Sequence, residues 1–334
     1  MKTYIRPLVQ VGTARPEQAL SLAGGWGWFT HVERLHRDGH DNVVPVSALS
    51  DDALVSLTSA RANILDLNLS APVIMGILNV TPDSFSDGGQ HEDLNAAVRA
   101  ATRMADHGAH LLDVGGESTR PGAALVPIPN EIQRTAPVIK ALRSGDSDTP
   151  ISIDTRKAEV AKAALDAGAN LVNDVAGFTF DPDLAPLCAQ RGVPICVMHA
   201  QGDPKTMQKD PTYDNVLLDV YDFLEERIHA LVALGIPKDQ IIADPGIGFG
   251  KTQAHNLIIL KRLSLFHSLG VPILLGASRK RFIGTLGNVP EAQFRAPGSI
   301  AVALAALEQG VQFVRVHDVA ETRQAIALWT ASRL

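Results

Sequence analysis

From residue 72 onward, short apolar runs alternate with longer segments whose apolar residues follow a helical spacing. Each short run is apolar at consecutive positions, which is typical of strands that are buried on both faces of a parallel sheet. Glycines such as Gly108 and Gly168 end the helical segments, because glycine readily adopts the left-handed backbone that stops a helix. The pattern predicts strands at residues 73–79, 110–115, 150–154, 171–174, 194–199, 241–244, 272–277 and 313–317.

Eight such units of strand and helix, the last helix being residues 319–334, predict an α/β fold, the (β/α)8 TIM barrel. An open, doubly wound sheet is the alternative. Nothing in the sequence marks a point where the strand order reverses, so the closed barrel is favoured.

Residues 1–71 do not share this rhythm. Short strands are predicted at Tyr4–Val11 and Asn42–Val46, and a helix is predicted at Ser50–Ala62. Two of the three tryptophans lie in the glycine-rich segment Gly24–Phe29, and we expect its aromatic rings to pack against the main domain. The sequence therefore predicts two domains: a small α+β N-terminal extension of unknown role, residues 1–71, and the barrel, residues 72–334.

The composition and charge of the chain limit the classes of molecule that we expect it to bind. The chain has 334 residues, of which 46% are hydrophobic, and a formal net charge of -6. An acidic balance does not favour nucleic acid, so an anionic ligand would need a local cluster of cations. Cys188 and Cys196 lack metal-ligand or disulfide spacing, and no apolar stretch of about 18 residues suggests a membrane span. We expect a cytoplasmic protein without a membrane segment, whose partners are small molecules.

Polar side chains stand at the end of every predicted strand. In a TIM barrel the carboxyl ends of the strands form the active site, so we expect these side chains to meet in one mouth. They are Asn79, Asp113, Asp154, Asn173, His199, Asp244, Ser278, Arg315 and His317.

The chemistry of this set suggests two kinds of ligand group. Asp154, Asn173 and Asp244 could bind the amidine-like edge of a pterin or guanine ring, since a carboxylate accepts two parallel N–H bonds. Residues 279–281, together with Arg315 and His317, could bind phosphate in the loops after strands seven and eight. Structural ion pairs within the barrel, and a solvated basic run, are the alternatives.

One glycine-rich segment, Gly246–Thr252, looks like a phosphate-binding loop. Its lysine and threonine fit the Walker motif, but Pro245 stands where that motif requires its first glycine. The segment also lacks the glycine spacing of a dinucleotide fingerprint. Neither nucleotide motif is therefore predicted.

Long motifs in the barrel resemble the dihydropteroate synthase family, from about residue 72 to the end of the chain. They are Gly76–Gly89, Gly115–Gly122, Ser152–Thr155, Asn173–Val175, Val197–His199, Ala243–Lys251, Ser278–Lys280 and Arg315–Asp318. The resemblance implies a (β/α)8 transferase of folate biosynthesis. Such an enzyme joins p-aminobenzoate to 6-hydroxymethyl-7,8-dihydropterin pyrophosphate and releases pyrophosphate. The resemblance also implies Mg²⁺ as cofactor, a dissociative SN1-like path and a homodimer.

The same resemblance implies roles for individual residues. Asp154, Asn173 and Asp244 would hold the pterin edge, while Lys280 bonds the ring and Met198 lines its pocket. Arg315 would also bind the pterin, by stacking on its ring. The residues implied in catalysis are Asp154, Asp244, Lys280, Arg315 and His317. Those implied for the pyrophosphate are Arg315, His317 and Asn79, the last also as a Mg²⁺ ligand. Those implied for the p-aminobenzoate pocket are Thr119, Arg120, Pro121, Phe249, Ser278, Lys280 and Arg281.

Arg281 departs from the family pattern, because some relatives carry serine there. A side-chain hydroxyl is then lost from the aminobenzoate pocket, and backbone N–H groups of the next helix are expected to take its place. Two other functions remain open. One is a methyltetrahydrofolate:corrinoid methyltransferase, and the other is a non-catalytic pterin-binding paralogue.

Overall fold

The computed structural model describes residues 2–81, 90–118, 124–145, 147–202 and 206–334, with the backbone alone at residues 90–93. Eight parallel strands form one sheet in the order β11-β10-β9-β8-β7-β6-β13-β12. A parallel bridge between Ala243 and Ile273 joins the two ends of this order, so the sheet is a nearly closed barrel. The predicted fold is confirmed, and the open-sheet alternative is wrong.

Each predicted barrel strand is present, with small differences at its ends. The last predicted strand but one, residues 272–277, is the shortest of the barrel strands. The barrel strands are β6 (Val73–Asn79), β7 (Leu111–Gly115), β8 (Ile151–Asp154), β9 (Leu171–Asp174), β10 (Ile195–Met198), β11 (Ile241–Asp244), β12 (Leu274–Leu275) and β13 (Phe313–Val316).

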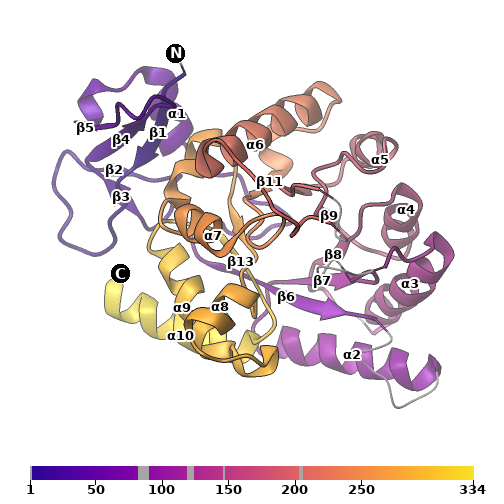
Figure 1. Cartoon of the computed structure of the whole chain (residues 1–334). Coiled ribbons are helices and arrows are strands. Elements are labelled where there is room, and N and C mark those ends of the chain that lie inside the picture. Colours follow the sequence, from indigo (N-terminus) through magenta and orange to yellow (C-terminus); the bar gives the residue numbers. More distant parts are fainter. Residues whose placement is uncertain (1, 82–89, 119–123, 146, 203–205) are drawn as a thin grey trace.

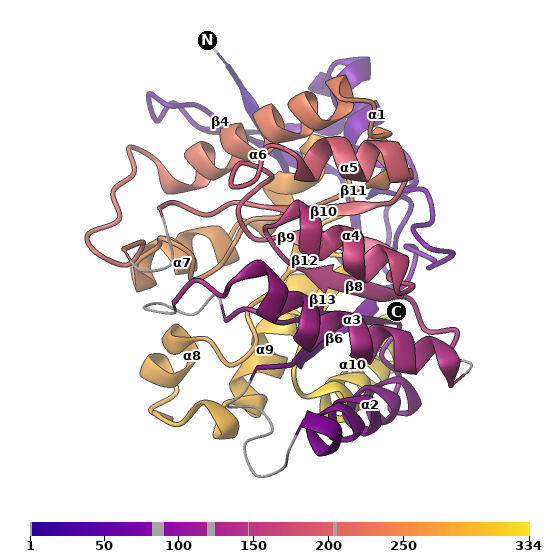
Figure 2. The same ribbon diagram turned by 90° about the vertical axis from the view of Figure 1, so that its right-hand side faces the viewer.

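Helices surround the barrel in Figures 1 and 2. The α-helices of this part are α2 (Gln90–Asp106), α3 (Ile128–Ser144), α4 (Ala158–Asp166), α5 (Leu184–Arg191), α6 (Val216–Ala233), α7 (Gln253–Leu260), α8 (Arg281–Leu286), α9 (Ala296–Leu307) and α10 (Val319–Arg333). The short 3-10 helices are η3 (Lys238–Gln240), η4 (Leu263–Leu269) and η5 (Ala292–Phe294). None of the described helices is both long enough and apolar enough to cross a bilayer.

The N-terminal extension is built on antiparallel strands. Its elements are β1 (Tyr4–Pro7), β2 (Leu20–Ser21), β3 (Trp28–Phe29), β4 (His31–Leu35), β5 (Asn42–Pro45), η1 (Val46–Ala48) and α1 (Asp51–Thr58). The sheet order is β1-β4-β5, and β2 pairs with β3. The predicted strands near residues 4 and 42 are confirmed. Strand β4, in the centre of the sheet, was not predicted.

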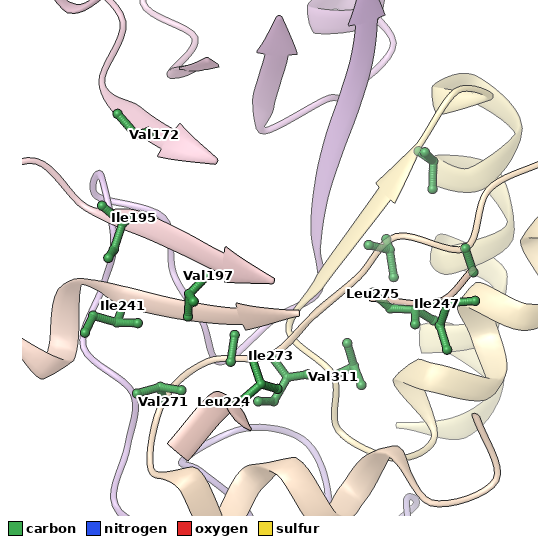
Figure 3. Packing of buried hydrophobic residues seen from close by; sticks show 14 of the residues in the cluster. Val172, Ile195, Val197, Leu224, Ile241, Ile247, Val271, Ile273, Leu275 and Val311 are labelled. Carbon is green, nitrogen blue, oxygen red and sulfur yellow. The ribbon is translucent and has the colours of Figure 1, made fainter. Parts of the chain in front are cut away.

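Apolar side chains pack on both faces of the barrel strands. Between strands and helices, one large buried cluster includes Val172, Ile195 and Ile241 from strands and Leu224 from α6 (Figure 3). A second cluster contains apolar residues of the barrel strands together with Ile64 and Leu69. These two residues come from the segment just before β6, so the end of the extension shares a core with the barrel.

Candidate active site

Arg315 of β13 links two buried carboxylates at the barrel mouth. Its Nε donates to Asp113 Oδ2 at 2.6 Å, and its Nη2 donates to Asp154 Oδ2 at 2.8 Å. Asp113, on β7, is completely buried, and Asp154 ends β8 with 7% of its surface exposed. The cation compensates two carboxylates that are costly to bury alone.

Asp154 is the carboxylate whose proton affinity changes most clearly. Burial raises its pKa to about 7, and the carboxylates of Asp113 and Glu131 add to this effect while Arg315 opposes it. Asp154 can therefore gain or lose a proton near neutral pH.

Asn173, Asp244 and Met198 lie on the neighbouring strands β9, β11 and β10. Asn173 Nδ2 donates to Asp113 Oδ2 at 3.2 Å, and Asp244 Oδ1 accepts from the backbone N–H of Gly246 at 2.7 Å. Met198 is 3% exposed and stands opposite Asp244 in the strand register. Burial also raises the pKa of Asp244. These side chains form one buried polar wall, as the strand-end pattern predicts.

One hydrogen-bond acceptor in this wall is unsatisfied. Asp113 Oδ1 is buried and has no hydrogen-bond partner among the described residues. A buried acceptor without a donor costs free energy, so a ligand with an N–H group suits this position. Asp113 belongs to the predicted strand-end set, but the sequence assigned it no role.

Lys280 contacts the loop that follows β11. Its Nζ donates to the carbonyl oxygen of Ile247 and lies 4.3 Å from the centroid of the Phe249 ring. Burial lowers the pKa of Lys280 to about 7, while the charge of Asp244 opposes this shift. Lys280 and Phe249 are thus brought together beside the polar wall.

Ser278 and His317 meet at the ends of β12 and β13. Ser278 Oγ accepts from the backbone N–H of His317 at 3.2 Å and lies 3.0 Å from His317 Nδ1. The other two cations of the predicted basic run lie elsewhere. Arg279 is paired with Asp318, and Arg281 is exposed at the start of α8.

Asn79 ends β6, partly buried, opposite Gly115 in the strand register. A Cβ at Gly115 would lie 3.7 Å from Asn79 Oδ1 and 3.5 Å from Asp154 Cβ. Glycine therefore leaves space between Asn79 and Asp154. The predicted site residues Thr119, Arg120 and Pro121 lie outside the described residues.

Two buried residues of the mouth were not predicted as site residues. Lys251 and His199 are 2% and 5% exposed, and Lys251 Nζ lies 2.7 Å from His199 Nδ1. His199 appeared in the strand-end pattern, and Lys251 appeared in the rejected phosphate-loop motif. The signals were present in the sequence, but the pairing depends on the fold.

One cavity lies away from the mouth. Its volume is ≈ 850 Å³, and it lies in the N-terminal extension, where its lining includes Arg34, His36 and Asp41.

A parallel eight-stranded barrel with carboxylate, amide and cationic side chains at one mouth has the architecture of a TIM-barrel enzyme. The family profile described as "Pterin binding enzyme" matches residues 75–317. The dihydropteroate synthase of Escherichia coli strain K12 is 46% identical over 266 residues, which are 80% of this chain and 93% of that protein.

Solved structures agree. A Yersinia pestis dihydropteroate synthase, in complex with a sulfonamide drug, is 48% identical with a TM-score of 0.75, covering 80% of this chain and 96% of that one. A Xanthomonas albilineans dihydropteroate synthase with 4-aminobenzoic acid is 46% identical with a TM-score of 0.75, covering 80% and 94%. The chain belongs to the dihydropteroate synthase family, whose members are transferases.

Proposed function

We propose that the barrel mouth joins p-aminobenzoate to 6-hydroxymethyl-7,8-dihydropterin pyrophosphate with Mg²⁺, and that the bond to pyrophosphate breaks before the amine attacks. The observation that carries this proposal is the Arg315 bridge between Asp113 and Asp154, at 2.6 and 2.8 Å. The guanidinium of Arg315 can neutralise the departing pyrophosphate, and the two carboxylates can stabilise positive charge on the pterin ring. The methyltransferase and the non-catalytic paralogue have no observation in their favour.

Three residues are assigned to the edge of the pterin ring: Asp154, Asn173 and Asp244. Two carboxylates and an amide can accept and donate along an amidine-like edge. Met198 is assigned to the ring pocket, which its burial and its position beside Asp244 support. The partner-free Asp113 Oδ1 offers one further acceptor for the substrate.

The pyrophosphate is assigned to Asn79, Arg315 and His317. Arg315 is the group best suited to the leaving anion, since its guanidinium stays charged at all working pH values. The amide oxygen of Asn79 is a hard ligand that suits Mg²⁺, which commonly keeps several waters and substrate phosphates in its coordination shell. Among the described residues, no cluster of three His, Cys, Asp or Glu side chains offers a cage for a metal. The donors therefore fit an ion held jointly with the substrate.

The p-aminobenzoate pocket is assigned to the loops around Lys280. Lys280 lies against the Phe249 ring, and Ser278 stands two residues before Lys280, which supports this assignment. Arg281 is exposed and follows Lys280 directly, so its backbone N–H, rather than a hydroxyl, would face the aminobenzoate carboxylate. The assignment extends to Thr119, Arg120 and Pro121 by family resemblance alone.

The reaction requires one bond to break and one to form. The bond between the exocyclic methylene carbon and the pyrophosphate oxygen breaks, and its electron pair leaves with the oxygen. Mg²⁺ supplies further neutralisation of the leaving charge when it is bound. Asp154 and Asp244 stabilise the positive charge shared by the methylene and the ring. The aryl nitrogen then attacks the methylene and loses one proton, a step that needs orientation more than a strong base.

Product analysis tests this function. The purified protein is mixed with the dihydropterin pyrophosphate and Mg²⁺, with and without p-aminobenzoate, and released pyrophosphate and product mass are measured. We expect 7,8-dihydropteroate only when p-aminobenzoate is present. Binding of the pterin without coupling would overturn the proposed reaction and favour another pterin enzyme.

Assembly and location extend the proposal. We assign the chain to the cytoplasm, and we assign a homodimer whose interface includes α8, α9 and α10. Large apolar side chains on and beside these neighbouring helices are exposed, namely Leu286, Phe294 and Leu328 at 57%, 62% and 67%. Exposed apolar patches of this kind often mark interfaces. Sedimentation should give twice the chain mass of 35.6 kDa, and Leu328→Glu should reduce it. A wild-type monomer would contradict this assignment.

A further inference from the structure

Lys251 is buried at the centre of the loop between β11 and α7. Its Nζ lies 2.7 Å from His199 Nδ1, 2.8 Å from the carbonyl oxygen of Gly246 and 3.1 Å from that of Phe249. Burial lowers the pKa of Lys251 well below its usual value, but the charge of Asp244 and the three acceptors around Nζ oppose this effect. In the ammonium form Nζ has three N–H donors, so it can satisfy all three acceptors. The pKa of His199 lies well below its usual value because of burial and the nearby Lys251, so its ring is neutral and Nδ1 can accept.

The backbone of this loop curls around the ammonium group. Gly246, Gly248 and Gly250 have φ values of +68°, +83° and +62°, a left-handed conformation that other residues rarely adopt. A Cβ at Gly246 would overlap the carbonyl oxygen of His199. Asn256 Oδ1 accepts from the Gly248 N–H at 2.7 Å, and the Tyr213 hydroxyl donates to Gly250 at 2.7 Å. These contacts restrict the conformation of the loop, and Lys251 binds the carbonyl oxygens of Gly246 and Phe249.

The outer side of the same loop touches Lys280. The carbonyl oxygen of Ile247 accepts from Lys280 Nζ, and the Phe249 ring lies 4.3 Å from that atom. Ile247 lies between Gly246 and Phe249, whose carbonyl groups bind Lys251. Lys251 is therefore connected to Lys280 through the backbone of this loop and the Phe249 side chain.

We propose that Lys251 is a positioning residue for the synthase reaction: it fixes the carbonyl oxygen of Ile247 and the ring of Phe249, which place Lys280 at the substrate. This inference rests on the role proposed above for Lys280. His199 completes the arrangement by supplying an acceptor from β10. The segment that looks like a phosphate loop therefore surrounds a cation of its own chain.

A double-mutant cycle tests whether Lys251 acts through Lys280. We expect Lys251→Met to lower kcat/KM for the dihydropterin pyrophosphate by about tenfold or more in the wild-type background, because residues joined through one network of contacts couple strongly. In the Lys280→Met background the same substitution should change kcat/KM by less than about twofold. An equal loss in both backgrounds would show a purely structural role and overturn the inference.

A second pair of variants covers the case in which Lys251→Met does not fold. His199→Asn keeps an oxygen acceptor near the position of Nδ1, whereas His199→Leu removes it. We expect His199→Leu to reproduce the loss of kcat/KM and its dependence on Lys280, and His199→Asn to retain most activity. Equal activity of the two variants would overturn the inference. Lys261→Met, at an exposed position after α7, is the matched control and should leave kcat/KM unchanged.

Thermal unfolding and product analysis of each variant separate the two proposals. A wild-type protein that forms no dihydropteroate would overturn the proposed function itself. A Lys280→Met variant with full activity would overturn the role of Lys280, and the inference with it. An impaired Lys280→Met variant combined with additive losses would overturn the positioning role of Lys251 alone.

Discussion

At the scale of single residues, the mouth depends on few charges, of which the carboxylates are almost completely buried. Asp154→Asn keeps the size of the side chain but removes the negative charge that faces Arg315 at 2.8 Å. We expect kcat to fall by about 100-fold or more, as when one electrostatic group of an active site is removed. Arg281→Ser changes an exposed residue and should leave kcat nearly unchanged. Steady-state coupling assays check both, and comparable losses would contradict the role of Asp154.

The pH dependence follows from two groups of the same mouth. Lys280, with its pKa lowered to about 7, is charged below that pH, and Asp154, with its pKa raised to about 7, is charged above it. If both must be charged, kcat/KM rises and then falls with pH, with its maximum near 7. Lys280→Arg stays charged at high pH and should remove the fall on the alkaline side. If kcat/KM of this variant still falls at alkaline pH, the deprotonation of another group causes the fall.

The sequence predicted the residue types of the mouth but not their pairing. Asp154, Asn173, Asp244 and Arg315 follow from strand ends, because a parallel barrel brings those ends together. That Arg315 bridges Asp113 and Asp154 depends on the order of β13, β7 and β8 around the barrel and on the path of a long side chain. Propensity and periodicity do not contain that information.

At the scale of secondary-structure elements, a buried charge cluster ties the end of β7 to α3 and α4. Lys157, at the N-terminal end of α4, donates at 2.5 Å to both Glu117 and Glu131. Arg156 donates to Glu117 at 2.5 Å, and Thr155 donates to Glu131 at 2.7 Å. Thr155 follows Asp154 directly, so the cluster connects these elements to the mouth.

Removing the central cation of this cluster should be costly. Lys157→Met leaves two buried carboxylates with Arg156 as the only remaining cation of the cluster, and we expect the free energy of unfolding to fall by about 3–5 kcal/mol. The control is Lys162→Met, which breaks the exposed pair with Asp166 and should leave the free energy of unfolding nearly unchanged. Urea unfolding of both variants measures the difference. A loss of the same small size in both would show that the cluster does not hold these elements together.

Strand β4 escaped prediction for a physical reason. Strand β4, with the sequence His-Val-Glu-Arg-Leu, has polar and charged residues at three of five positions. Its strand pattern becomes visible only because Val32 and Leu35 are buried while β1 and β5 pair on either side. The apolar runs of the barrel, in contrast, are buried on both faces and can be read from the sequence directly.

At the scale of the whole molecule, the extension is attached to the barrel by contacts of several kinds. Arg37 forms ion pairs with Asp219 and Asp222 of α6, at 2.7 and 2.6 Å. Tyr4 packs edge-on against Tyr221, with ring centroids 5.4 Å apart. Such contacts, with the shared core at Ile64 and Leu69, favour one cooperative folding unit over two independent domains.

Trp26 offers a test of this cooperativity. Its indole N–H donates to the carbonyl oxygen of Leu307 at 2.8 Å, and its ring meets Trp329 at 6.3 Å. The packing of this tryptophan against the main domain confirms the expectation for one ring of its glycine-rich segment. Phe29 instead belongs to a buried cluster of the extension, and the Trp28 indole donates to the carbonyl oxygen of Gly12. We expect Trp26→Ala to lower the free energy of unfolding by about 3 kcal/mol, because a large aromatic contact and a hydrogen bond are both lost.

The test is whether this loss of stability affects the extension alone or the extension and the barrel together. If the extension and the barrel unfold as one unit, tryptophan fluorescence and synthase activity should be lost together in urea, and both curves should shift to lower concentration in Trp26→Ala. Val55→Ala lies in the same extension at a position that is 59% exposed. It should change the free energy of unfolding obtained from either curve by no more than about 0.5 kcal/mol. Two separate transitions, with activity unchanged in Trp26→Ala, would show instead that the extension folds independently of the barrel. The role of residues 1–71 would then have to be sought outside the stability of the catalytic fold.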